Sequence, residues 1–219
     1  MNYELLIKKA KKEIDNGFNK MGRKIDNPSF LEKYLIVSTL KAVKLSDAIV
    51  FLCKNDFNNE SLIILRSLIE HSVNMHWIIK DNTKEKLSNY ISDLEKINYG
   101  ERWPEIDLSK RLEDLGYKNR DYYDFVIKFT YSYAHVNAKA LDWKEVIKIE
   151  GLKSEPFPAQ AIYSIVAQML GHILKSLNIH FKGLFDSYSD IWKEIEVDKN
   201  SLRKKIEKIA KNLDKQDIY

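Results

Sequence analysis

The stretch that decides the fold is Leu62–Ile79, which reads LIILRSLIEHSVNMHWII. On a helical wheel at about 100° per residue, its apolar side chains spread around most of the circumference. A helix that is apolar on nearly every side is buried among other helices. We therefore expect this stretch to form the central helix of the protein, with the remaining helices packed around it.

The same helix has a polar stripe on the arc that its apolar residues leave open. Arg66, Glu70 and Asn74 follow one another at i, i+4 and i+8, and Ser67 and His71 adjoin them. Burying an arginine or a carboxylate costs several kcal/mol unless the charge is paired. Arg66 and Glu70 can pair with each other, because residues four apart are neighbours on a helix. The stripe is either a functional site or a network that ties helices together.

The rest of the chain also favours helices. It has only 7 Gly and 4 Pro in 219 residues and no alternating stretch bounded by hairpin signals. We predict an all-α fold, a helical bundle of about seven to nine helices with long antiparallel central helices. The chain length fits one domain over residues 1–219, with residues 186–219 as a candidate C-terminal helical appendage.

Apolar periodicity and capping signals predict where the other helices lie. Asn27-Pro28 is the capping pair expected to open the second helix, and a short polar turn makes that helix the antiparallel neighbour of the central one. The predicted helices are Tyr3–Asp15, Ser29–Lys54, Glu60–Lys80, 83–99, Leu108–Leu115, Asn119–Val136, Phe157–Phe181 and Ser201–Leu213.

The composition describes a globular protein of the cytoplasm. Apolar residues make up 44% of the chain and charged residues 31%, and the net charge of +4 permits contact with nucleic acid without requiring it. The single cysteine, Cys53, excludes an internal disulfide and fits a small core residue. No apolar run is long enough to span a membrane, and the first residues lack the apolar core of a signal peptide.

The predicted helix Asn119–Val136 has a second polar face. Lys128, Tyr131, Ser132 and His135 fall on one arc, beside aromatic residues that would anchor that arc at the core. If this face and the stripe of the central helix point toward each other, their ionisable groups converge in one site.

The paired segments R-S-L-I-E-H (Arg66–His71) and Y-S-Y-A-H (Tyr131–His135) resemble a bacterial all-helical family of unknown function, in which an R-S-L-x-E helix is followed by an S-x-x-H segment. A more distant similarity is to the HEPN superfamily of helical bundles. That superfamily includes metal-independent ribonucleases of toxin and antiphage systems, and its signature is an arginine followed shortly by a histidine.

The resemblance implies a ribonuclease that binds RNA and uses no metal or other cofactor. Its catalytic residues would be Arg66, His71 and His135, and the residues that bind or orient the substrate would be Glu70, Asn74, Lys128, Tyr131 and Ser132. Superfamily ribonucleases commonly build their site across a homodimer. The basic helix Ser201–Leu213 is a candidate surface for a partner protein or nucleic acid.

A non-catalytic reading of the same residues stays open. Arg66 and Glu70 can be a buried ion pair that joins helices, and His135 can be a core histidine with satisfied hydrogen bonds. The chain would then be an interaction module, or a sensor that binds a small anionic ligand.

Overall fold

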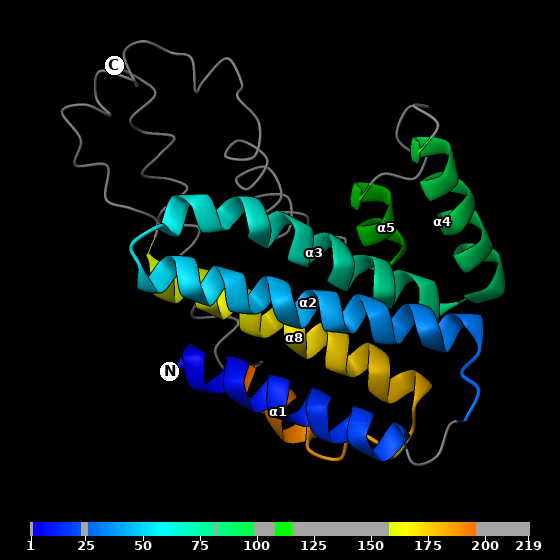
Figure 1. Cartoon of the computed structure of the whole chain (residues 1–219), viewed down its shortest axis with the longest axis horizontal. Helices are drawn as coiled ribbons and strands as arrows, with labels where there is room; N and C mark the ends of the chain where they lie inside the picture. Colours follow the sequence, from blue (N-terminus) through cyan, green and yellow to red (C-terminus); the bar gives the residue numbers. More distant parts are fainter. Residues whose placement is uncertain (1, 23–25, 82, 99–107, 116–157, 196–219) are drawn as a thin grey trace, which may run out of the picture.

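The protein is described from a computed structural model, which covers residues 2–22, 26–81, 83–98, 108–115 and 158–195. All regular structure in these residues is helical, which confirms the predicted all-α class (Figure 1). Residues 188–195 are also helical. The bounded helices are α1 (Tyr3–Met21), α2 (Phe30–Lys54), α3 (Asn58–Lys80), α4 (Thr83–Asn98), α5 (Leu108–Asp114) and α8 (Ala159–His180).

The helices α2 and α3 form the predicted antiparallel hairpin (Figure 1). The turn between them is tight, because the Phe57 amide donates a hydrogen bond to the Leu52 carbonyl at 2.9 Å. Asp56 adopts a left-handed conformation with φ of 63°. Aspartate tolerates this region better than most residues, so the turn needs no glycine.

The start of α2 corrects the predicted cap. Ser29, and not the pair Asn27-Pro28, is the N-cap residue. Its hydroxyl accepts a hydrogen bond from the Glu32 amide at 3.3 Å, and the Glu32 carboxylate accepts one from the Ser29 amide at 2.6 Å. This reciprocal capping box satisfies two of the amide groups that a helix start leaves without partners.

The centre of the bundle is the contact between α3 and α8, as expected for α3. Thirteen residues of α3 are buried, and α8 is buried without interruption from Ala161 to Leu174. Polar groups in this contact are paired across it: the Ser72 hydroxyl donates to the Met169 carbonyl at 3.3 Å, and His76 lies 3.2 Å from the Ser176 hydroxyl. No helix in the described residues is long and apolar enough to cross a membrane.

The first helix is longer than predicted and ends at Met21 rather than Asp15. Its additional turns pack against the segment that follows α8, where the buried ring of Phe185 lies against Gly17. The buried carboxylate of Glu13 accepts a hydrogen bond from the Ser187 amide at 2.9 Å. The sequence pattern alone does not show these contacts, because the partners are more than 160 residues away.

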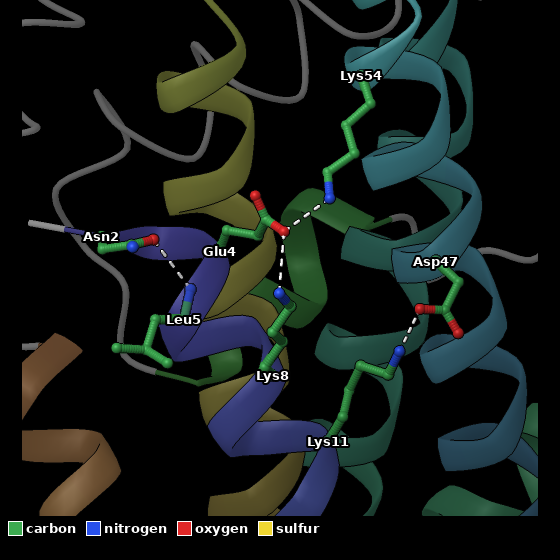
Figure 2. A network of polar contacts seen from close by, with 7 residues as sticks. All are labelled: Asn2, Glu4, Leu5, Lys8, Lys11, Asp47 and Lys54. Atoms are coloured by element: carbon green, nitrogen blue, oxygen red, sulfur yellow. Dashed lines mark hydrogen bonds and ion pairs between the residues drawn. The ribbon is translucent and has the colours of Figure 1, made fainter.

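Ion pairs join α1 to α2 along the surface (Figure 2). Glu4 accepts from Lys8 at 3.2 Å and from Lys54 of α2 at 2.7 Å. Lys11 pairs with Asp47 of α2. Exposed pairs of this kind contribute little to stability.

We predict that Gly17→Ala destabilises the protein. A Cβ atom at this position would overlap the ring of Phe185, which has no room to move in the core. Overpacking of this kind costs about 1–3 kcal/mol, more than the gain of up to about 1 kcal/mol from the helix propensity of alanine. Urea unfolding followed by circular dichroism measures the difference.

Gly22→Ala is the matched control, because a Cβ atom there comes no closer than 3.6 Å to the Phe18 carbonyl oxygen. Its midpoint should stay where it is or rise slightly. The double variant Gly17→Ala/Phe185→Leu should recover part of the loss. Equal stability of Gly17→Ala and the parent protein would contradict this account of the α1 contact.

Candidate functional site

The polar stripe on α3 contains the predicted ion pair. The Arg66 Nε atom donates to Glu70 Oε1 at 2.6 Å, one turn along the helix. The side chain of Arg66 is 21% exposed and that of Glu70 33% exposed. The carboxylate therefore holds the guanidinium in place through a charge-assisted hydrogen bond, while the Arg66 side chain as a whole keeps about a fifth of its surface exposed.

His71 follows directly and lies half-buried beside α2. Burial lowers the pKa of its imidazole below the ordinary 6.5, and the nearby ammonium of Lys41 lowers it further, against the opposing charge of Glu70. The imidazole is therefore neutral at pH 7. A neutral imidazole can accept a proton, which is the property that a general base requires.

Asn74, the third member of the stripe, makes hydrogen bonds with side chains of two other helices. It is 7% exposed, its Oδ1 accepts from the Arg111 Nη1 atom at 2.5 Å, and its Nδ2 lies 3.4 Å from the Tyr90 hydroxyl. Arg111 comes from α5 and Tyr90 from α4. Asn74 thus joins α3 to α4 and α5.

Arg111 is the residue of this region that the sequence reasoning missed. Its guanidinium is buried and lies 5.3 Å from the ring centres of both Trp77 and Tyr90, within the range of a cation–π contact. The indole of Trp77 in turn donates to the Asp114 carboxylate at 2.8 Å. One signal was present in the sequence: Asn74 and Trp77 lie three residues apart and so face the same neighbour.

The second half of the predicted site lies outside the described residues. This applies to Lys128, Tyr131, Ser132 and His135, and to the predicted helices Asn119–Val136 and Ser201–Leu213. The convergence of the two polar stripes therefore stays a prediction. Among the residues that the structure does describe, no group of three His, Cys, Asp or Glu side chains is arranged to hold a metal ion.

The described part of the site offers a fixed cation and a proton acceptor on one helix. Arg66 and His71 are about 140° apart around α3 at the regular helical angle, so they face different directions. One small substrate group cannot lie against both side chains of the same helix. A site that uses both needs a further element or a second subunit to bring them to one substrate.

We predict that Asn74→Ala reduces stability, because Arg111 loses a buried hydrogen-bond acceptor. The expected loss is about 1–3 kcal/mol, the usual penalty for removing one partner of a buried polar pair. Asn74→Asp keeps an acceptor opposite the guanidinium and should retain most of the stability. Chemical denaturation measures both variants.

Asn178→Ala, at a half-exposed position of α8, is the control and should leave the unfolding midpoint nearly unchanged. A fully stable Asn74→Ala protein would show that the contact with Arg111 does not support the bundle. Asn74 would then be free to serve a ligand, as the sequence analysis expected.

Comparison with known proteins gives one finding. Residues 32–97, which include most of α2, all of α3 and most of α4, match the family described as "Family of unknown function (DUF5677)". The matched range holds Arg66, Glu70, His71 and Asn74, so similarity to a family of unknown function is confirmed for this part of the chain. The segment Tyr131–His135 lies outside the match. No curated protein and no solved structure matches the chain.

Proposed function

We propose that this protein is a HEPN-like metal-independent ribonuclease. The observation that supports the proposal best is the Arg66 side chain, whose Nε atom is held by Glu70 at 2.6 Å and which is 21% exposed. The neutral imidazole of His71 on the same helix adds a group that can accept a proton. These are two of the three functions that RNA cleavage without a metal requires.

The reaction begins when a base removes the proton of the ribose 2′-hydroxyl. The 2′-oxygen then attacks the adjacent phosphorus, the bond to the 5′-oxygen breaks, and an acid gives that leaving oxygen a proton. His71 and His135 are proposed for the two proton transfers, and Arg66 for stabilising the negative charge on the phosphorane. Glu70 keeps the guanidinium in place.

The remaining predicted residues bind the substrate in this proposal. Lys128, Tyr131 and Ser132 would contact phosphate, and two subunits would complete the site, because Arg66 and His71 point in different directions on α3. The proposed setting is a toxin or antiphage system in the bacterial cytoplasm. The basic helix Ser201–Leu213 would dock a partner protein or nucleic acid.

The purified protein should cleave tRNA or mixed RNA in the presence of EDTA. Arg66→Ala should lower the rate by about 100-fold or more, because it removes the cation that stabilises the transition state. His71→Ala and His135→Ala should have effects of similar size. Gel electrophoresis of labelled RNA measures the rates, and thermal melting checks that the variants are folded.

Lys8→Ala is the matched control for Arg66→Ala, since Lys8 pairs with Glu4 at the same i, i+4 spacing on α1. His180→Ala is the control for the histidine variants. Both controls should cleave RNA at the parental rate. Intact RNA after incubation with the parent protein, or full activity of folded Arg66→Ala, would remove the ribonuclease proposal.

The pH dependence of cleavage offers a separate prediction. A base works in its neutral form, so kcat/KM falls as the pH drops through the pKa of His71. Burial and Lys41 hold this pKa below 6.5, and the acid limb should therefore lie below pH 6.5. Lys41→Ala removes a positive charge near the imidazole, raises its pKa, and should shift the acid limb to higher pH.

Lys44→Ala, one turn from Lys41 on the exposed surface of α2, should leave the acid limb in place. If the limb does not respond to Lys41→Ala, or moves to lower pH, His71 is not the base. His135 would then be the remaining candidate for that role.

The second candidate function is a non-catalytic module that senses a ligand or binds a partner. The observation that favours it is the contact of the buried residues Asn74, Arg111 and Trp77 with the half-buried Tyr90, in which a polar residue of α3 joins helices. In this case Arg66 would bind a small anion without changing it. Binding of inorganic phosphate that Arg66→Ala abolishes, together with intact RNA, would favour the module.

A further inference from the structure

The outer surface of α2 has an apolar stripe that none of the described helices covers. Phe30, Val37, Leu40 and Phe51 are 62%, 64%, 47% and 66% exposed. At the regular helical angle they fall within an arc of about 80°. Figure 1 shows α2 in front of α8. The four residues run from the first residue of α2 to its last turn.

The stripe is large enough to take part in a specific contact. With the side-chain areas typical of aromatic and aliphatic residues, its four members expose roughly 400 Å² of apolar surface. The aliphatic stems of Lys33 and Lys44, which lie on the same arc, extend this surface. Two such faces would bury roughly 800 Å² in total, which is the size expected of a weak association rather than of a stable complex.

We propose that this stripe binds the same stripe of a second copy, with the two α2 helices antiparallel. Phe30 and Phe51 lie at nearly equal distances from Leu40, one on each side. An antiparallel pair centred on Leu40 therefore places each Phe30 beside Phe51 of the other copy. The face is self-complementary in the way that a two-fold interface requires.

The charges on the stripe select the antiparallel arrangement. An antiparallel pair centred on Leu40 brings Lys33 of each copy beside Asp47 of the other copy. It also places the aliphatic stem of Lys44 against Val37 of the other copy. Asp47 is available for this contact, because its side chain is 57% exposed even though it pairs with Lys11. A parallel pair would instead place each of Lys33, Lys44 and Asp47 opposite the same residue of the other copy. Like charges directly opposite each other repel, which disfavours that arrangement.

This inference does not depend on the chain cleaving RNA. It names the surface and the direction of a self-association, and neither requires a catalytic residue. Its failure and the failure of the ribonuclease proposal can therefore be told apart, since the tests below measure only mass and cross-linking.

Because the contact is small, sedimentation is run on the full chain at a high concentration of about 100 µM, where the mass should rise to near twice 25.8 kDa. Val37→Lys places an ammonium opposite Lys44 of the other copy and should weaken the dimer by about tenfold or more. Val37→Glu meets the same lysine with a carboxylate and should weaken it less. Ile179→Lys, at an exposed apolar position of α8, should leave the dimer unchanged.

Cysteine cross-linking tests the direction. The natural Cys53 is buried, so the parent chain should form no disulfide dimer under mild oxidation. Leu40→Cys lies at the two-fold axis and should cross-link to itself, whereas two copies of Phe30→Cys would lie about 30 Å apart and should not. A mixture of Phe30→Cys and Phe51→Cys should cross-link.

A monomeric parent protein at this concentration would overturn the proposal. Equal self-cross-linking of Leu40→Cys and Phe30→Cys would also overturn it, because that result fits a parallel pair or random collision. A dimer that withstands Val37→Lys would place the interface elsewhere. All these variants change exposed side chains, and circular dichroism verifies that each one is folded.

Discussion

The contact between α3 and α8 is the interaction on which the rest of the structure depends. Both helices are apolar around most of their circumference, and each fully buried Leu or Ile in the contact contributes about 1.5–3 kcal/mol. Burial also sets the conditions for polar groups, which must find partners or keep a route to solvent. The behaviour of the α3 stripe follows from this constraint: Asn74 is buried and bonded to Arg111, whereas Arg66 and Glu70 pair with each other at the margin.

Features of the fold that depend on residues close together in the sequence could be predicted from the sequence alone. The periodicity of Leu62–Ile79 identified the central helix, and the short polar turn before it indicated the antiparallel hairpin with α2. One capping residue and one helix end were predicted wrongly, for different reasons. At α2 the prediction favoured Pro28 over the reciprocal pair of Ser29 and Glu32. At α1 the last turns are held by Phe185 and Ser187, which no local pattern reveals.

The same distinction separates the parts of the candidate site. The pair of Arg66 and Glu70 is a local feature of one helix, so spacing alone was sufficient to predict it. The partners of Asn74 come from α4 and α5, and their positions depend on how three helices meet. A helical wheel places Asn74 on the same stripe as Glu70. It does not show that the buried guanidinium of Arg111 in α5 donates a hydrogen bond to Asn74. The effect of Lys41 on the pKa of His71 likewise depends on how α2 packs beside α3, which a helical wheel of α3 does not show.

The packing of α1 against residues 185–195 has a consequence for the order of folding. Lys9 pairs with Glu194, Glu13 accepts from Ser187, and Gly17 receives Phe185, so the first helix finds these partners only near the end of the described chain. During synthesis the ribosome releases α1 long before those residues emerge. The apolar side of α1 therefore stays exposed, or is bound by a chaperone, until residues 185–195 pack against it. Contacts between residues far apart in the sequence slow folding. We therefore expect the packing of α1 against residues 185–195 to be a late step in the folding of this bundle.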